Sequence, residues 1–344
     1  MLIRYILLLA LAALCLQACQ KDLIGEAPKA DPESVFYHIW KDFHENYGLF
    51  GPKGVDWYDL YQTLHQQVDP QSTTRELYDL TIALLSPLND RHVTLYPASD
   101  PELPRWSVDL TEGGVYVTED FDLEVVKDRY LTGLHEPLPY LQYGWAAPQI
   151  GYLHIQHMDG KQKDYEQALD EALQFFGDAE GLVLDLRDDA GGFDPISQYV
   201  AGRFASEKRL YMTSRKKNGP GSDDFTETEE WYVEPTGTSQ FTRPIAVLTS
   251  GSTASAGETL LLALRTQGHI TQFGATSSGN FSDAPMWEAP NGWTYTISVG
   301  DYRAADGQSY EGIGLSPQVE VLNQKEELQN GQDKALEKAI EWLQ

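Results

Sequence analysis

Cysteine is nearly absent from this chain. Only Cys15 and Cys19 occur among its 344 residues, and both lie near the N-terminus. If residues 1–18 are removed on export, the single remaining thiol can form neither an internal disulfide nor a thiolate metal site. Chemistry that depends on pairs of cysteines is therefore excluded.

Positive charge is scarce as well. The chain has 25 Lys and Arg residues against 52 Asp and Glu residues, which gives a formal net charge of −27. Such a chain repels phosphate backbones and anionic lipid surfaces, so we expect no nucleic-acid partner. Its hydrophobic content of 41% suits a globular protein with a solvated, acidic surface.

The longest apolar run is confined to the N-terminus, in residues 1–18, MLIRYILLLALAALCLQA. The run follows Arg4 and is too short for a stable membrane span, which is typical of a signal peptide. Its end, LQAC, resembles the bacterial lipobox and predicts lipidation at Cys19; a plain secretory signal is the alternative. A lipid there would anchor the protein to a membrane of the cell envelope, with residues 19–31 as a polar tether.

Helical periodicity dominates residues 32–95, which we interpret as an N-terminal helical subdomain. Apolar residues recur along one helix face after Pro32, and two further helices are predicted in residues 56–68 and 73–88. Residues 96–147 are first Pro-rich and then alternate between apolar and polar residues, which predicts connecting strands in residues 108–118 and 122–134.

Strands and helices alternate from residue 148 to the end of the chain. Continuous apolar strands between amphipathic helices predict a mostly parallel sheet covered on both faces. A last amphipathic helix is predicted in residues 332–344. Ligands bind such sheets at the C-terminal ends of strands, where a loop leads into the next helix. Residues 185–194 and 248–258 are glycine-containing connections of this kind.

The second junction, LTSGSTASAGE, could expose a nucleophile at the start of a helix. A hydroxyl on a tight turn, a base that takes its proton and nearby backbone N–H groups make such a nucleophile. Thr253 stands where the first Gly of a G-x-S-x-G elbow belongs, so helix capping and turn formation are the alternative. The paired Gly191 and Gly192 either donate N–H groups to a neighbouring site or form a simple turn.

Ordered motifs carry a family resemblance over residues 148–322. The segments LVLDLRDDAGG, PIAVLTSGSTASAGETLLLAL, FGATSSGN, NGWTYTIS and DGQSYEGIGLSPQVEV resemble those of the serine peptidases that include the C-terminal-processing proteases and the tricorn core protease. LLSPLNDRHVTL is similar to the N-terminal helical portion of that family. The resemblance implies an α/β protein with an N-terminal helical subdomain and a Clp/crotonase-like core, in which a mostly parallel sheet is flanked by helices.

The same resemblance implies a serine endopeptidase that acts on peptides or proteins without a cofactor or a metal. Its nucleophile falls on Ser255, and the N–H of Ala256 is the nearest oxyanion donor. Gly191 and Gly192 would supply the second donor. Two neighbouring hydroxyl residues are interpreted as turn residues, Ser250 and Ser252.

The base distinguishes two branches of the family. The lysine of the C-terminal-processing dyad falls on Asn280, whose amide cannot accept the proton. The tricorn-like branch instead implies His92 as the proton shuttle and Glu311 as the acid that supports it. Tricorn has a relay Ser where this chain has Arg91, so either Glu311 reaches His92 directly or Arg91 pairs with Glu311.

Two other features bear on function. His154 and His157 point to opposite faces of a strand and are not expected to share a metal, while Asp188 and Asp189 are expected to cap a loop. The stretch between the helical subdomain and the core is short for a PDZ domain, which predicts that none is present. The alternative functions are a non-catalytic peptide- or lipid-binding protein on the same fold, and an acyl-CoA hydratase or hydrolase, which the motif order does not favour.

Overall fold

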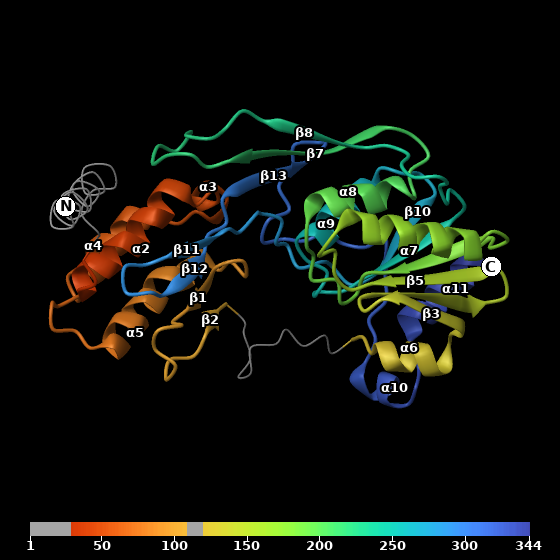
Figure 1. Ribbon diagram of the computed structural model, residues 1–344, viewed down its shortest axis with the longest axis horizontal. Coiled ribbons are helices and arrows are strands. Elements are labelled where there is room, and N and C mark those ends of the chain that lie inside the picture. Colours follow the sequence, from red (N-terminus) through yellow and green to blue (C-terminus); the bar gives the residue numbers. More distant parts are fainter. Residues whose placement is uncertain (1–28, 109–119) are drawn as a thin grey trace, which may run out of the picture.

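The computed structural model describes residues 29–108 and 120–344. The predicted signal peptide, Cys19, most of the tether and the strand predicted after residue 108 lie outside the described residues. Figure 1 shows an N-terminal helical unit on one side of the molecule and a larger sheet with its helices on the other. In the described part of the chain, no helix is both long and apolar enough to cross a membrane.

Helices form most of the N-terminal unit, and those predicted in residues 32–95 are confirmed. Asp31, Asp56 and Thr73 cap three of them by accepting backbone N–H groups, and Glu76 completes a capping box with Thr73. The helices are α2 (Pro32–Asn46), α3 (Phe50–Lys53), α4 (Trp57–His65), α5 (Thr74–Leu85) and the 3-10 turn η1 (Ser86–Leu88).

An antiparallel sheet completes this unit with strands from distant parts of the chain. Its order is β11 (Met286–Glu288), β12 (Thr294–Thr296), β1 (Thr94–Tyr96) and β2 (Trp106–Ser107). Leu95 pairs with Tyr295, and both are buried against the helices. Residues of the predicted core segment 148–344 are thus packed with the N-terminal helices.

The largest sheet in the described residues has seven strands and is mostly parallel, as predicted. Strands β14 to β5 run parallel, and β4 and β3 are added antiparallel at one edge. Its order is β14 (Val319–Glu320), β10 (Ile270–Gly274), β9 (Ile245–Thr249), β6 (Gly181–Asp185), β5 (Ile150–Ile155), β4 (Leu141–Ala147) and β3 (Thr132–Leu138).

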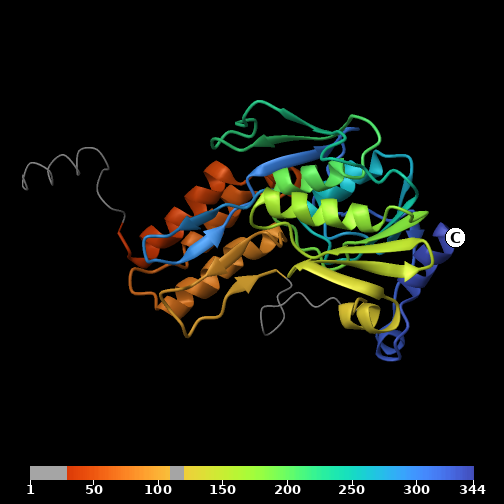
Figure 2. The ribbon, with the colours of Figure 1, turned by 45° about the vertical axis from the view of Figure 1, so that its right-hand side comes forward.

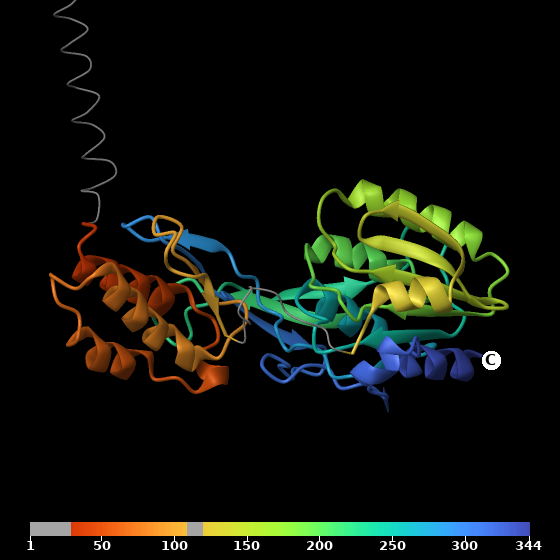
Figure 3. The same ribbon diagram turned by 90° about the horizontal axis from the view of Figure 1, so that it is seen from below.

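Helices cover both faces of this sheet, with α7 and α11 on opposite sides (Figure 3). One face carries α7 (Gln162–Phe175), α8 (Asp194–Gly202) and α9 (Ala256–Arg265). The other carries α6 (Leu123–Arg129) and α11 (Lys334–Leu343), and α10 (Lys325–Gln329) precedes α11.

The strand predicted for residues 122–134 is wrong over most of its length. Asp122 accepts the N–H groups of Glu124 and Val125 and so begins helix α6, while only the last residues of the segment enter β3. Alternation of apolar and polar residues over so short a segment did not distinguish a strand from a helix.

A third sheet joins the two parts of the molecule. Its order is β13 (Gly300–Ala304), β7 (Arg209–Lys216) and β8 (Glu229–Val233), all antiparallel. Figures 1 and 2 show β7 and β8 as an arm that runs from the core towards the N-terminal helices. In the chain β13 directly follows β12, so one strand of the third sheet is continuous with the N-terminal sheet.

Candidate active site

Ser255 lies on a strained turn between β9 and α9. Its φ of 54° and ψ of −124° are rare for a residue with a side chain, and such strain costs about 1–3 kcal/mol. The turn is held by the Ser255 N–H, which donates to the Asn280 carbonyl at 2.9 Å, and by the Ser255 carbonyl, which accepts from Glu258 N–H at 2.8 Å. This strand–turn–helix geometry is that of a nucleophile elbow, although the G-x-S-x-G pattern is absent.

The neighbouring hydroxyl residues serve the turn, as predicted for Ser250. Its buried Oγ donates to the Arg187 carbonyl at 2.5 Å and accepts the Ser252 N–H at 2.9 Å. Thr253 Oγ1 donates to the Leu186 carbonyl at 2.6 Å. These bonds tie the turn before α9 to the glycine-containing turn after β6.

Gly191 lies directly against the candidate nucleophile. Its φ is 99°, and a Cβ at this position would lie 2.6 Å from Ser255 Cβ and 2.9 Å from Ala256 N. Any side chain would therefore collide with the elbow. The Gly191 N–H itself donates to Asp189 Oδ1 at 2.8 Å, so Asp189 caps this turn as expected.

Two backbone donors remain beside Ser255. Among the described residues, neither the Gly192 N–H nor the Ala256 N–H has a hydrogen-bond partner. Ala256 is the first residue of α9, where an N–H has no acceptor within the helix and the helix dipole favours negative charge. The arrangement suits an oxyanion more closely at Gly192 and Ala256 than at Gly191.

Glu258 organises the loop that faces the nucleophile, and its role was not foreseen from the sequence. Oε1 accepts hydrogen bonds from Ser277 Oγ at 2.6 Å and Gly279 N–H at 2.7 Å, and Oε2 accepts from Asn280 N–H at 2.7 Å. Burial raises the pKa of Glu258 to about 7. Asn280, at the position of the dyad lysine, holds Ser255 through its carbonyl and donates from Nδ2 to Ser278 Oγ at 2.6 Å.

His92 is fixed by its own backbone just before β1. Its N–H donates to Asp90 Oδ1 at 2.9 Å, and its carbonyl accepts from Thr296 Oγ1 of β12 at 2.5 Å. Asp90, which the sequence reasoning missed, also accepts from Tyr47 Oη at 2.9 Å. An acid two residues before the histidine, in NDRH, was the available signal for this turn.

The environment of His92 favours the neutral imidazole. Burial lowers the pKa of His92, while the carboxylates of Asp90 and Asp283 oppose that change. Nδ1 is buried and has no partner among the described residues. The ring is therefore available as a proton acceptor.

Glu311 is buried in the same charged neighbourhood. Oε2 accepts from Phe281 N–H at 2.9 Å and Ser282 N–H at 3.3 Å, while Oε1 has no partner in the described part of the chain. Burial and the nearby Asp90 carboxylate raise the pKa of Glu311 to about 8. The Asp90 carboxylate raises the pKa of Glu311 and also opposes the lowering of the His92 pKa.

The three predicted catalytic side chains are not joined by hydrogen bonds. Within residues 29–108 and 120–344, His92 bonds neither Ser255 nor Glu311 through its ring. Arg91 Nη1 donates to Ser278 Oγ at 3.0 Å, and the two alternatives for Arg91 and Glu311 stay predictions. The assignment of roles to Ser255, His92 and Glu311 stays a prediction.

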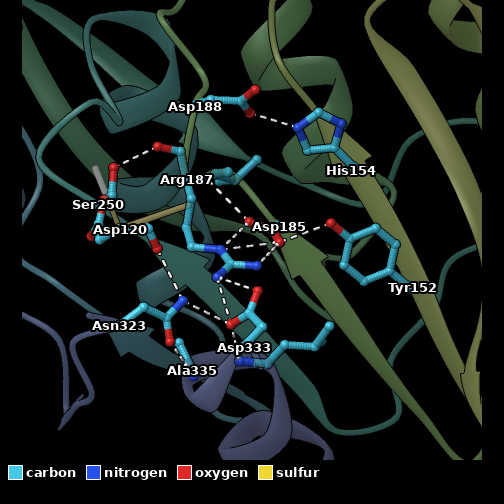
Figure 4. Close-up of polar contacts among 12 residues, drawn as sticks. Asp120, Tyr152, His154, Asp185, Arg187, Asp188, Ser250, Asn323, Asp333 and Ala335 are labelled. Atoms are coloured by element: carbon cyan, nitrogen blue, oxygen red, sulfur yellow. Dashed lines mark hydrogen bonds and ion pairs between the residues drawn. The ribbon is translucent and has the colours of Figure 1, made fainter. Parts of the chain in front are cut away.

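A buried charge network supports the glycine-containing turn from below (Figure 4). Arg187 Nη2 lies 2.5 Å from Asp185 Oδ2, and Nη1 lies 2.8 Å from Asp333 Oδ2. Asp333 also caps α11 by accepting the Leu336 N–H at 3.0 Å. The C-terminal helix is thereby tied to the residue that begins the turn.

The histidines of HIQHM do not form a metal site. His154 is buried in β5 and bonds Asp188, whereas His157 follows the strand. No group of three or more His, Cys, Asp or Glu residues in the described part of the chain is arranged to hold a metal ion.

Comparison with known proteins gives consistent similarities. A family model described as Peptidase family S41 matches residues 149–321, just over half of the chain, and one described as Tricorn protease C1 domain matches residues 28–85. The carboxy-terminal processing protease CtpA of Bacillus subtilis is 28% identical over 42% of this chain and 29% of its own length. A carboxyl-terminal-processing protease of Synechocystis is 24% identical over 65% of this chain and 49% of its own. The chain thus spans about half or less of these curated relatives.

Solved structures share the fold over most of the length of this chain. A candidate peptidase from Parabacteroides merdae has 26% identity and a TM-score of 0.78, covering 92% of this chain and 97% of its own. The photosystem II D1 C-terminal processing protease has 17% identity and a TM-score of 0.56, covering 90% and 98%. The tricorn protease has 15% identity and a TM-score of 0.54, covering 91% of this chain and 37% of its own.

Proposed function

The chain belongs to peptidase family S41, and we propose that it is a serine endopeptidase that cleaves peptide bonds through Ser255, His92 and Glu311. The observation that carries this proposal is the strained turn of Ser255 beside the unpartnered N–H groups of Gly192 and Ala256. Relatives named as carboxy-terminal processing proteases support a peptide or protein substrate.

The proposed reaction begins with attack of Ser255 Oγ on the substrate carbonyl carbon. The His92 imidazole takes the hydroxyl proton, and the N–H groups of Gly192 and Ala256 hold the oxyanion. When the C–N bond breaks, His92 gives this proton to the leaving amine. Water then attacks the acyl-enzyme in the same way, which releases the acid and restores Ser255.

Glu311 supports the imidazolium that forms in each step. Its unpartnered Oε1 is available to accept a hydrogen bond from a protonated ring nitrogen of His92. When Glu311 is ionised, its carboxylate stabilises the positive charge on that ring. Burial raises the pKa of Glu311 to about 8, so the neutral acid is favoured below that pH. On this proposal the support strengthens as Glu311 ionises, so activity rises with pH through that range.

Covalent labelling tests the nucleophile. A fluorophosphonate probe should label the wild-type chain at Ser255, and Ser255→Ala should abolish the label, while His92→Ala should reduce the labelling rate strongly. Ser252→Ala is the matched control on the same turn and should retain labelling. Peptide mapping that places the label elsewhere, or no label at neutral and mildly alkaline pH, would contradict the proposal.

A non-catalytic peptide- or lipid-binding role is the competing function, because His92 has no bond to Ser255 in this structure. Equal thermal stabilisation of wild type and Ser255→Ala by a peptide or lipid, without any cleavage, would favour that role.

We also propose export and lipid anchoring at Cys19, on the strength of the LQAC sequence. The described domain would then face solvent beside a membrane of the cell envelope. Labelled palmitate should be incorporated into the wild type and not into Cys19→Ser, and the mature chain should begin at residue 19. A mature N-terminus at another residue would contradict this assignment.

A further inference from the structure

A histidine–carboxylate pair adjoins the proposed oxyanion turn and takes no part in the mechanism above. Asp188 lies three residues before Gly191 in the turn that follows β6. His154 Nε2 lies 2.5 Å from Asp188 Oδ1, and Figure 4 shows the pair beside the Arg187 network. Asp188 Oδ2 accepts a second hydrogen bond, of 3.0 Å, from Gln156 Nε2.

The partners of His154 determine where its protons lie. Nδ1 is 2.6 Å from Gln142 Oε1, and Gln142 Nε2 donates to the Pro139 carbonyl at 3.0 Å. If this amide were reversed, Gln142 Oε1 would face the Pro139 carbonyl oxygen without a hydrogen between them. Gln142 Oε1 is therefore the atom that faces His154. Nδ1 must therefore donate. Nε2 then shares one proton with Asp188 Oδ1, so the two side chains are joined whichever of them carries it.

The histidine of this pair is buried, and its carboxyl partner lies at the edge of solvent. The His154 side chain is 0% exposed and that of Asp188 is 17% exposed. The ring of Phe121 lies 5.7 Å from the His154 ring and 4.4 Å from the Arg187 guanidinium carbon, so one aromatic ring contacts both side chains. An apolar pair of similar volume would avoid the cost of burying these polar groups, which argues for a role other than stability.

The position of the pair indicates that role. The segment after β5 and the glycine-containing turn are already joined by backbone bonds, with Ala190 N–H donating to the Gln156 carbonyl at 3.1 Å and Met158 N–H donating to the Gly191 carbonyl at 2.7 Å. The short His154–Asp188 hydrogen bond adds a directional contact between side chains of the same two segments.

We infer that His154 is a positioning residue of the proposed peptidase: its ring holds Asp188 and so fixes the turn whose Gly191 lies against Ser255. The inference rests on the proposed function for its effect on catalysis. The proton on Nδ1 of His154 is a separate property of the folded protein and can be measured without substrate.

Nitrogen NMR of the full chain labelled with ¹⁵N-histidine tests the protonation. The His154 signals are those missing from His154→Gln and retained in His157→Gln, a matched histidine just beyond the same strand. We expect a directly bonded proton on Nδ1 of His154, because Nδ1 donates to Gln142 Oε1. A bare Nδ1 would overturn the inference, whatever the protein catalyses.

Kinetics tests the positioning. In His154→Gln and in Asp188→Asn, kcat should fall by about ten-fold to a hundred-fold with KM changed by less than about two-fold, because a misdirected oxyanion donor weakens the transition state. The double variant should be no slower than the worse single variant, because both remove the same tie. His157→Gln should keep the wild-type kcat.

Wild-type kcat in the folded Asp188→Asn variant would overturn the positioning role. Asp188 is at the edge of solvent, so this variant remains informative if His154→Gln fails to fold. If the wild type neither cleaves peptides nor labels at Ser255, the proposed function fails, and the NMR result alone then decides whether Nδ1 of His154 carries a proton.

Discussion

Replacing Gly191 by alanine should remove most of the activity while leaving the protein folded. The new Cβ would lie 2.6 Å from Ser255 Cβ, where carbon atoms ordinarily approach to about 3.5–4.0 Å. The elbow or the turn must therefore shift by about 1 Å, and a shift of that size at a reacting group costs about a hundred-fold in rate, or about 2.7 kcal/mol in the barrier. The positive φ of 99° adds about 1–2 kcal/mol of strain to the folded state.

Two alanine variants separate these effects. Gly307 has a φ of 83° with nothing within 4 Å of its Cβ position, and Gly251 has open space without a positive φ. Gly307→Ala should lose stability with wild-type activity, and Gly251→Ala should change neither. The measurements are kcat/KM on a peptide, the rate of fluorophosphonate labelling and the unfolding temperature. Labelling of a folded Gly191→Ala at the wild-type rate would refute the placement of Gly191 against the nucleophile.

Other variants address the buried charges. Because burial raises the pKa of Glu311 from 4.5 to about 8, kcat/KM should rise with pH through that range and the rise should be lost in Glu311→Gln; a rise that persists would contradict the role of Glu311. The same shift means that the folded state holds a proton which the unfolded state releases, so the stability contributed by Glu311 is full below pH 4.5 and is lost as pH rises through about 8. In urea unfolding, Glu311→Gln should therefore lose less free energy of unfolding than the wild type over this pH range. In Asp90→Asn the activity rise should move to lower pH, because the Asp90 carboxylate helps to raise the pKa of Glu311; an unmoved profile would count against their proximity. Arg187→Met leaves the carboxylates of Asp185 and Asp333 buried without their cation and should lower the free energy of unfolding by about 3–5 kcal/mol, so an unchanged urea midpoint would contradict the network.

The parts of the fold that sequence predicted are those set by local periodicity. The amphipathic helices α2 and α9 and the buried strands β6 and β9 carry their patterns within a few turns or residues. Helix α6 was missed because its seven residues are too few for a helical period to emerge, although Asp122 was present as a cap. The pairing of β1 with β12 joins residues about 200 positions apart, and no local pattern encodes such a contact.

The residues of the site also divide into those that a local sequence pattern predicts and those that depend on distant contacts. The elbow at Ser255 was predictable because small residues and hydroxyl groups cluster at one strand-to-helix junction. The residues that support the elbow were not predictable. In the sequence Glu258 is indistinguishable from an ordinary helix residue, and only the fold brings the loop around Asn280 against it. Thr296 likewise gains its role only when β12 reaches the carbonyl of His92.

Two side-chain atoms of the site, His92 Nδ1 and Glu311 Oε1, have no partner among the described residues and bear on how catalysis would work. A buried polar atom without a partner costs about 1–3 kcal/mol, and the free protein carries two of them close to the same carboxylate, Asp90. In the proposed reaction His92 becomes an imidazolium only after attack by Ser255, and its new positive charge is then stabilised by the carboxylate of Glu311. Bonds that are missing before attack and form during it stabilise the transition state selectively, which lowers the barrier without tightening the binding of substrate. The absence of a preformed triad is on this argument compatible with a working peptidase.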